Sequence, residues 1–135
     1  MLPVKYLSLQ KSELEYEVRI RGATAASSVE ELRKQIVKLS SEYPAEHILE
    51  SPLDIRQDLK GCLEVLTKIQ TNLDVSDPSE PSLMRTQNML DHLHNRLARL
   101  TPSKDTKDEY DEIFKGYKFL SKRLASLQVN RPTPG

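Results

Sequence analysis

The chain has 135 residues, 20 acidic and 20 basic side chains, and one cysteine, Cys62. This length is sufficient for one domain with its own hydrophobic core. The zero net charge excludes a general attraction of the whole chain for nucleic acid or anionic membranes. A single cysteine excludes an internal disulfide and a multi-cysteine zinc site, and it suits a reducing compartment.

The sequence lacks the features of a membrane or secreted protein. No segment approaches the roughly 20 consecutive apolar residues of a membrane span. Residues 1–6 do not combine a basic start with an apolar run, so they do not have the pattern of a signal peptide. We therefore expect an intracellular protein, in the cytoplasm, the nucleus or both.

The first part of the chain predicts two helices separated by a glycine. A helix over residues 11–21 is expected to end at Gly22, because glycine commonly follows a helix C-terminus. Ser27 or Ser28, with a glutamate three residues later, predicts the N-cap of a second helix that ends near Pro44. The apolar positions of this second helix recur at helical spacing: Val29, Leu32, Ile36 and Leu39.

Three longer helices are predicted in the rest of the chain. After a short turn over 44–51, the Ser-Pro pair at 51–52 predicts the start of the third helix. The fourth begins after the Asp-Pro pair at 77–78 and ends at the Thr-Pro pair at 101–102, and the fifth covers 105–127. Short loops predict an antiparallel bundle. The expected inward stripes are Ile55, Leu59, Cys62, Leu66, Ile69 and Leu73, then Leu83, Leu90, Leu93, Leu97 and Leu100, and then Tyr110, Ile113, Tyr117, Leu120, Leu124 and Leu127.

Two glycines, Gly61 and Gly116, fall inside predicted helices. Each costs about 1 kcal/mol relative to alanine in a helix interior. The glycines are either tolerated on the surface or required where two helices approach closely, and the sequence favours close approach at Gly116, beside the inward Tyr117.

The three histidines and the cysteine do not predict a metal or catalytic site. His92 and His94 are two residues apart, so they point to nearly opposite sides of a helix and cannot share a metal ion. We expect both, and His47, to lie at the surface or its rim. Cys62 lies on the apolar stripe of the third helix, where a thiol is usually a small buried hydrophobic group.

The spacing of the carboxylates and the absence of catalytic motifs also argue against an enzyme. Glu13, Glu15 and Glu17 are spaced by two, which is expected to spread them around a helix surface rather than to pair them for acid–base chemistry. Phosphate-binding, dinucleotide-binding, zinc-protease and nucleophile-elbow motifs are absent from the sequence. We expect no catalytic residue, no cofactor, no metal, no small-molecule substrate and therefore no enzyme.

The clearest local pattern covers residues 9–36, where a helix, a glycine stop, an extended loop and a second helix follow one another. It resembles the SAP motif, a helix–extended loop–helix module that binds DNA. The resemblance implies a small core and a turn at Arg21-Gly22. The chain departs from the motif at Ser27, where the family has glycine, and at Val29, where it usually has a basic residue. The implied core residues are Leu9, Leu14, Val18, Leu32 and Ile36.

Two interpretations of this SAP-like pair stay open. The pair either binds nucleic acid weakly or is a packing module with the same shape. In the first case the contacts come from basic side chains that gather on one side, and salt weakens the binding steeply. In the second, those side chains are part of a solvated face of mixed charge. The candidate residues are Arg19, Arg21, Arg33, Lys34 and Lys38.

A wider pattern covers about residues 5–128. The segments 14–22, 29–34 and 85–93, together with the leucine-rich third helix, resemble the N-terminal part of Gag-like proteins of insect LTR retrotransposons. In that family a capsid region and a zinc knuckle come later, and this sequence contains neither. The resemblance implies an all-α protein with a SAP-like helical pair followed by an antiparallel three-helix bundle.

The expected organisation is a SAP-like module over residues 1–43, a helical bundle over 44–128 and a flexible tail or linker over 129–135. The expected function is a structural or assembly domain that self-associates as a homo-oligomer and positions a partner protein or RNA, away from membranes. The alternatives are a SAP-type DNA- or RNA-binding adaptor, and a helical scaffold that docks a partner helix.

Overall fold

The computed structural model describes residues 1–129, and every regular element among them is helical. This confirms the all-α class expected from the sequence. The five α-helices of this part of the chain are α1 (Lys11–Arg19), α2 (Val29–Glu42), α3 (Ile55–Leu73), α4 (Glu80–Ala98) and α5 (Lys107–Val129). Two short 3₁₀ turns are η1 (Tyr6–Ser8), before α1, and η2 (Ala45–His47), after α2.

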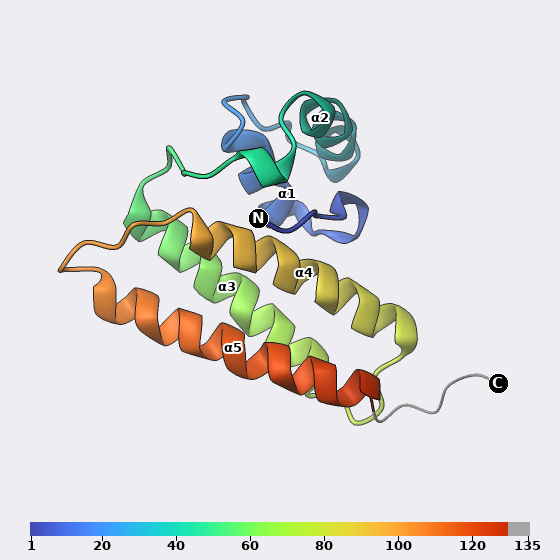
Figure 1. Cartoon of the computed structure of the whole chain (residues 1–135). Coiled ribbons are helices and arrows are strands. Elements are labelled where there is room, and N and C mark those ends of the chain that lie inside the picture. The colour runs from blue at the N-terminus through green and yellow to red at the C-terminus, as the bar shows by residue number, and fades with distance from the viewer. Residues whose placement is uncertain (130–135) are drawn as a thin grey trace.

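The three long helices lie side by side. Figure 1 shows α3, α4 and α5 with alternating directions, and α1 and α2 together next to α4. Each of the three long helices packs against the other two, and α1 packs chiefly against α2. Within residues 1–129, no helix has both the length and the apolar character needed to cross a membrane.

One connected cluster of buried apolar side chains extends through all five helices. It includes Leu14 of α1, Leu32 of α2, Leu59 of α3, Leu93 of α4 and Leu120 of α5. These positions belong to the apolar stripes that helical spacing predicts, so those stripes turn inward as expected. Cys62 is also fully buried within this cluster, as predicted.

Helices α1 and α2 begin and end close to the predicted residues. α1 ends at Arg19, two residues earlier than expected, and Gly22 then adopts a φ of +82°, which glycine reaches without steric cost. Ser28 caps α2, because its hydroxyl accepts a hydrogen bond from the backbone N–H of Glu31 at 3.2 Å.

The predicted start of α3 at residues 51–52 is wrong. Asp54 is the N-cap, and its carboxylate accepts a hydrogen bond from the backbone N–H of Gln57 at 3.1 Å. Ser51 instead accepts a hydrogen bond from the N–H of Leu53 at 3.2 Å, in the loop before the helix. Aspartate and serine are comparable N-caps, so the local pattern left two starts available.

The last two helices differ from expectation by a few residues. Ser79 caps α4 by accepting a hydrogen bond from the N–H of Ser82 at 3.2 Å, and Pro81 lies in the first turn. α5 begins and ends two residues later than expected, at Lys107 and Val129. Apart from Val129, the tail expected over 129–135 lies outside the described residues.

Both helical glycines face a side chain from a neighbouring helix. A Cβ added at Gly61 would overlap the guanidinium of Arg96, with its Cζ at 3.0 Å. A Cβ added at Gly116 would lie 2.8 Å from Cδ2 of Leu66. Close approach therefore occurs at both positions, and the group at Gly61 is a buried, ion-paired guanidinium rather than a flexible methyl group.

We expect Gly61→Ala to lower the free energy of unfolding by about 1–3 kcal/mol, the usual cost of overpacking. Gly116→Ala should cost less, because Leu66 can rotate away whereas Arg96 is held by its ion pair. Alanine gains about 1 kcal/mol of helix propensity at both positions, so this gain does not change the order. Urea unfolding of both variants checks this order. A Gly61→Ala protein as stable as the parent would contradict the fixed position of Arg96.

Candidate functional site

Charged side chains are buried where α1 faces α3 and α4. Ionisable groups are rarely fully buried without a partner, because desolvation penalises an isolated charge. The partners of these groups therefore decide how α1 is held against the long helices. We call this group the ionic seam, and it comprises Glu13, Glu17, Asp58, His92, Arg96 and Arg99.

Glu17 is the centre of the first part of the ionic seam. Its carboxylate accepts hydrogen bonds from Nδ1 of His92 at 2.8 Å and from Nη1 of Arg21 at 3.1 Å. Arg21 also donates to the hydroxyl of Tyr6 at 2.8 Å and to the backbone carbonyl of Tyr43 at 2.9 Å. One guanidinium thus connects η1, α1 and the residue after α2, while Glu17 connects α1 to α4.

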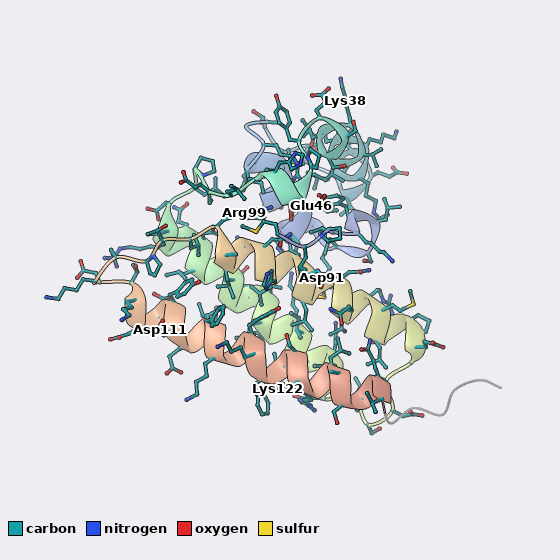
Figure 2. The ribbon with its side chains drawn as sticks, in the orientation of Figure 1. Lys38, Glu46, Asp91, Arg99, Asp111 and Lys122 are labelled. Atoms are coloured by element: carbon teal, nitrogen blue, oxygen red, sulfur yellow. The ribbon has the colours of Figure 1, made fainter. Side chains whose placement is uncertain are left out.

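Arg96 of α4 and Arg99, the C-cap residue that follows α4, form the second part. Nε of Arg96 donates to the carboxylate of Asp58 on α3, and the Arg96 guanidinium lies 4.0 Å from the centre of the Tyr16 ring. Arg99 donates to the Tyr16 hydroxyl at 3.2 Å and to backbone carbonyls of η2 and the following residue at 3.1 and 2.9 Å. Figure 2 shows Arg99 near η2. Tyr16 is therefore enclosed by two cations, Arg96 in α4 and Arg99 at the C-cap of α4.

Glu13 forms the third part, at the edge toward α3. Its Oε2 accepts hydrogen bonds from the Ser12 hydroxyl and from Nζ of Lys68, the latter at 3.0 Å. Among the described residues, Oε1 of Glu13, Oδ2 of Asp58 and Nε2 of His92 are buried without a hydrogen-bond partner. These three atoms are left unsatisfied within the protein. Breaking an ion pair of the ionic seam would leave a buried charge without its partner, which is costly.

The ionic seam corrects two expectations from the sequence. His92 was expected at the surface and is fully buried. Glu13 and Glu17 were expected on the surface of α1 and are fully buried, because residues four apart lie on the same helix face. Only Glu15, between them, is turned outward to pair with Arg19 at 3.4 Å.

The other groups considered for chemistry lie apart from one another. His47 is exposed, and His94 is partly buried with Nδ1 3.2 Å from the hydroxyl of Tyr117. Burial raises the pKa of the Cys62 thiol to about 12, so it stays protonated at neutral pH. In residues 1–129, no three His, Cys, Asp or Glu side chains are grouped so as to hold a metal ion.

The ionic seam lowers the pKa of both buried glutamates. Burial by itself raises the pKa of Glu17, but the His92 hydrogen bond and the charges of His92 and Arg21 outweigh it. Burial likewise raises the pKa of Glu13, and hydrogen bonds from Ser12 and Lys68 outweigh it. A carboxyl with a lowered folded-state pKa stabilises the fold above its unfolded pKa, and this contribution is lost as pH falls through the folded value.

We therefore expect the free energy of unfolding to fall as pH decreases below about 4.5, the ordinary glutamate pKa. Urea unfolding between pH 7 and pH 3 measures this. Glu17→Gln should lower stability at pH 7 and flatten the acid dependence, whereas Glu30→Gln, at an exposed position of α2, should change neither. Equal acid dependence in the parent and the Glu17→Gln variant would contradict the role assigned to Glu17.

The five candidate cations from the sequence do not form one surface. Arg33, Lys34 and Lys38 are exposed on α2, and Figure 2 shows Lys38 pointing outward at the edge of the molecule. Arg19 is exposed on α1 and pairs with a glutamate of the same helix. Arg21 has no exposed side-chain area and its donors contact groups inside the protein. Three cations of α2 therefore remain as an accessible group.

A shallow groove on α3 was not anticipated from the sequence. It measures about 420 Å³, and most of its lining is apolar. The side chains recur at steps of three and four, the spacing of one helix face. This spacing is the feature of the sequence that could have indicated the groove. Because the face carries one leucine among charged and polar residues, its pattern is also that of an ordinary solvated helix surface. We call it the α3 groove, and it is lined by Lys60, Leu63, Glu64, Thr67 and Lys68.

Comparisons with protein-family models, curated proteins and solved structures find no match to this chain. The functional proposal therefore depends on the chemistry of the ionic seam, the exposed cations of α2 and the α3 groove.

Proposed function

We propose that the chain is a non-enzymatic structural or assembly domain of a Gag-like protein. In this proposal it acts in the cytoplasm or nucleus, self-associates, and positions a partner protein or RNA. The observation that carries the proposal is the α3 groove, a surface with a mostly apolar lining on a long helix, in which Leu63 is 48% exposed. Such a surface is suited to a contact with another helix.

The ionic seam supports a structural rather than a catalytic role. Its charged groups contact other helices of the same chain, as in the pairs Glu17–His92 and Asp58–Arg96. Buried pairs of this kind restrict which elements can pack together. They suit a domain that presents a surface of constant shape to a partner.

Within this proposal, residues 1–43 are a SAP-like module and residues 44–128 an antiparallel three-helix bundle. Support comes from the five implied core residues, Leu9, Leu14, Val18, Leu32 and Ile36, which are all buried. Further support comes from the loop before α2. The Gln35 side chain accepts from the N–H of Ala26 at 2.8 Å and donates to the carbonyl of Thr24 at 2.9 Å.

The experiment that tests the assembly role is a solution mass measurement of the full chain, with and without a single-stranded RNA. We expect the mass to rise with protein concentration in the absence of RNA, which indicates self-association. A mass that stays at the monomer value under both conditions would overturn the proposal.

The second candidate is a SAP-type DNA- or RNA-binding adaptor. The exposure of Arg33, Lys34 and Lys38 on one helix favours it. The acidic residues on the same helix, Glu30, Glu31 and Glu42, oppose it by cancelling the charge. A third candidate, a scaffold that docks the helix of another protein, would use the α3 groove.

If α2 binds nucleic acid, we expect weak binding that is steeply weakened by salt, because few phosphates are neutralised. Changing Arg33, Lys34 and Lys38 to Glu should abolish it while thermal stability stays nearly unchanged, since all three are exposed. Titration of a labelled oligonucleotide at two salt concentrations measures this.

The matched control for this titration changes exposed lysines of α5, Lys115 and Lys122, to Glu. It alters charge away from α2 and should leave most of the binding intact. Ser27→Gly restores the glycine that the SAP motif has in its loop and should strengthen binding. If neither the parent nor the Ser27→Gly variant binds at low salt, the adaptor function is excluded.

A further inference from the structure

One face of α3 is left open to solvent. Lys60, Leu63, Glu64 and Thr67 are all exposed and lie on the same side of the helix, where they line the α3 groove. The opposite side of the helix faces the core, where its apolar side chains are fully or almost fully buried: Leu59, Cys62, Val65 and Ile69. An exposed leucine with charged neighbours on one long helix can be covered by a second helix.

The charges of the α3 groove are arranged so that the groove complements itself. Lys60 and Glu64 lie on either side of Leu63 along the helix, and neither forms an ion pair within residues 1–129. Lys68 differs, because it is paired with Glu13. The groove therefore offers one unpaired cation, one exposed apolar side chain and one unpaired anion.

We propose that the α3 groove binds a second copy of the same chain, with the two α3 helices antiparallel about a two-fold axis near Leu63. A two-fold contact uses the same surface of both copies, so that surface must be complementary to itself. In this arrangement the two Leu63 side chains meet, and Lys60 of each copy lies opposite Glu64 of the other. Both ion pairs then form at once.

The inference rests on the proposed self-association and names its surface. A contact confined to one helix face is expected to bury little surface area for a protein interface, under roughly 1,200 Å² in total. The dimer is therefore weak and its population depends on protein concentration. The other proposed occupant of the groove, a helix of a different protein, has no requirement for Lys60 and Glu64 to complement each other.

The test is sedimentation equilibrium of the full chain over a wide range of concentrations. Lys60→Glu gives two anions facing each other across the axis, and Glu64→Lys gives two cations. Each single variant should raise the dimer dissociation constant at least about tenfold, which corresponds to about 1.4 kcal/mol. The double variant Lys60→Glu/Glu64→Lys reverses both charges and should dimerise like the parent.

Mixing the two single variants gives a sharper result. A Lys60→Glu copy with a Glu64→Lys copy has opposite charges at both contacts, so the mixture should form a heterodimer more tightly than either variant dimerises alone. Leu63→Glu should abolish dimerisation. Phe119→Glu, at an exposed position of α5, is the matched control and should leave it unchanged. Thermal unfolding of every variant checks that the fold is retained.

The outcomes distinguish failure of the α3 groove as the dimer interface from failure of the proposed self-association. If the parent dimerises but the mixture of single variants forms no heterodimer and Leu63→Glu has no effect, another surface mediates assembly and this inference is overturned. If the parent remains monomeric at the highest concentration, both this inference and the proposed self-association fail.

Discussion

Replacing Arg96 by alanine is expected to lower the free energy of unfolding by about 3–5 kcal/mol, the usual effect of removing one partner of a buried ion pair. The substitution leaves Asp58 buried on α3 without its cation, and Asp58 already has one oxygen without a hydrogen-bond partner. It also removes the guanidinium that lies 4.0 Å from the centre of the Tyr16 ring. Both losses occur where α1, α3 and α4 meet.

Urea unfolding at pH 7 measures the effect, and Arg56→Ala is the control. Arg56 is exposed on α3, so the control loses the same kind of side chain and should change stability by about 0.5 kcal/mol or less. The double variant Asp58→Asn/Arg96→Ala should be less destabilised than the sum of the two single variants, because the two groups are in direct contact. Additive effects would show that Arg96 and Asp58 do not act as a pair.

The second large effect is expected from Leu93→Ala, which should lower the free energy of unfolding by about 2–5 kcal/mol. Leu93 lies in the middle of α4, is fully buried and belongs to the cluster that extends through all five helices. Truncation removes apolar contacts and leaves a cavity that the surrounding helices can only partly fill. The magnitude within this range depends on how far α3 and α5 relax toward α4.

Met84→Ala is the control for Leu93→Ala, because Met84 is on the same helix and is 57% exposed. It should change stability by about 0.5 kcal/mol or less. Thermal and urea unfolding of both variants check the difference. If Leu93→Ala unfolds like Met84→Ala, the face of α4 that packs against the core has been assigned incorrectly.

The candidate sites were only partly predictable from the sequence. The spacing of Leu32 and Ile36 places Arg33, Lys34 and Lys38 away from the core, and all three are exposed. The hypothesis that basic side chains gather on one side of the SAP-like pair groups Arg21 with them. It is instead enclosed, and nothing in the local pattern indicates that Tyr6 and Tyr43 would accept its hydrogen bonds.

The sequence by itself determined the helices and the apolar faces that they bury. Leucine and isoleucine at steps of three and four, together with caps such as Ser28 and the stop at Gly22, are local features that act within a few residues. Burial of an apolar side chain is non-directional, so any apolar partner satisfies it. This is why the all-α class and most core positions could be predicted without the tertiary structure.

Only the tertiary structure decided the partners of the buried charges. Glu17 and His92 are separated by 75 residues, and Asp58 and Arg96 by 38. A hydrogen bond requires a particular donor and acceptor at a defined distance and angle, and helical spacing carries no information on which distant groups meet. The apolar pattern therefore specified which faces turn inward, whereas the packing of α1 against α3 and α4 determined which charges they enclose.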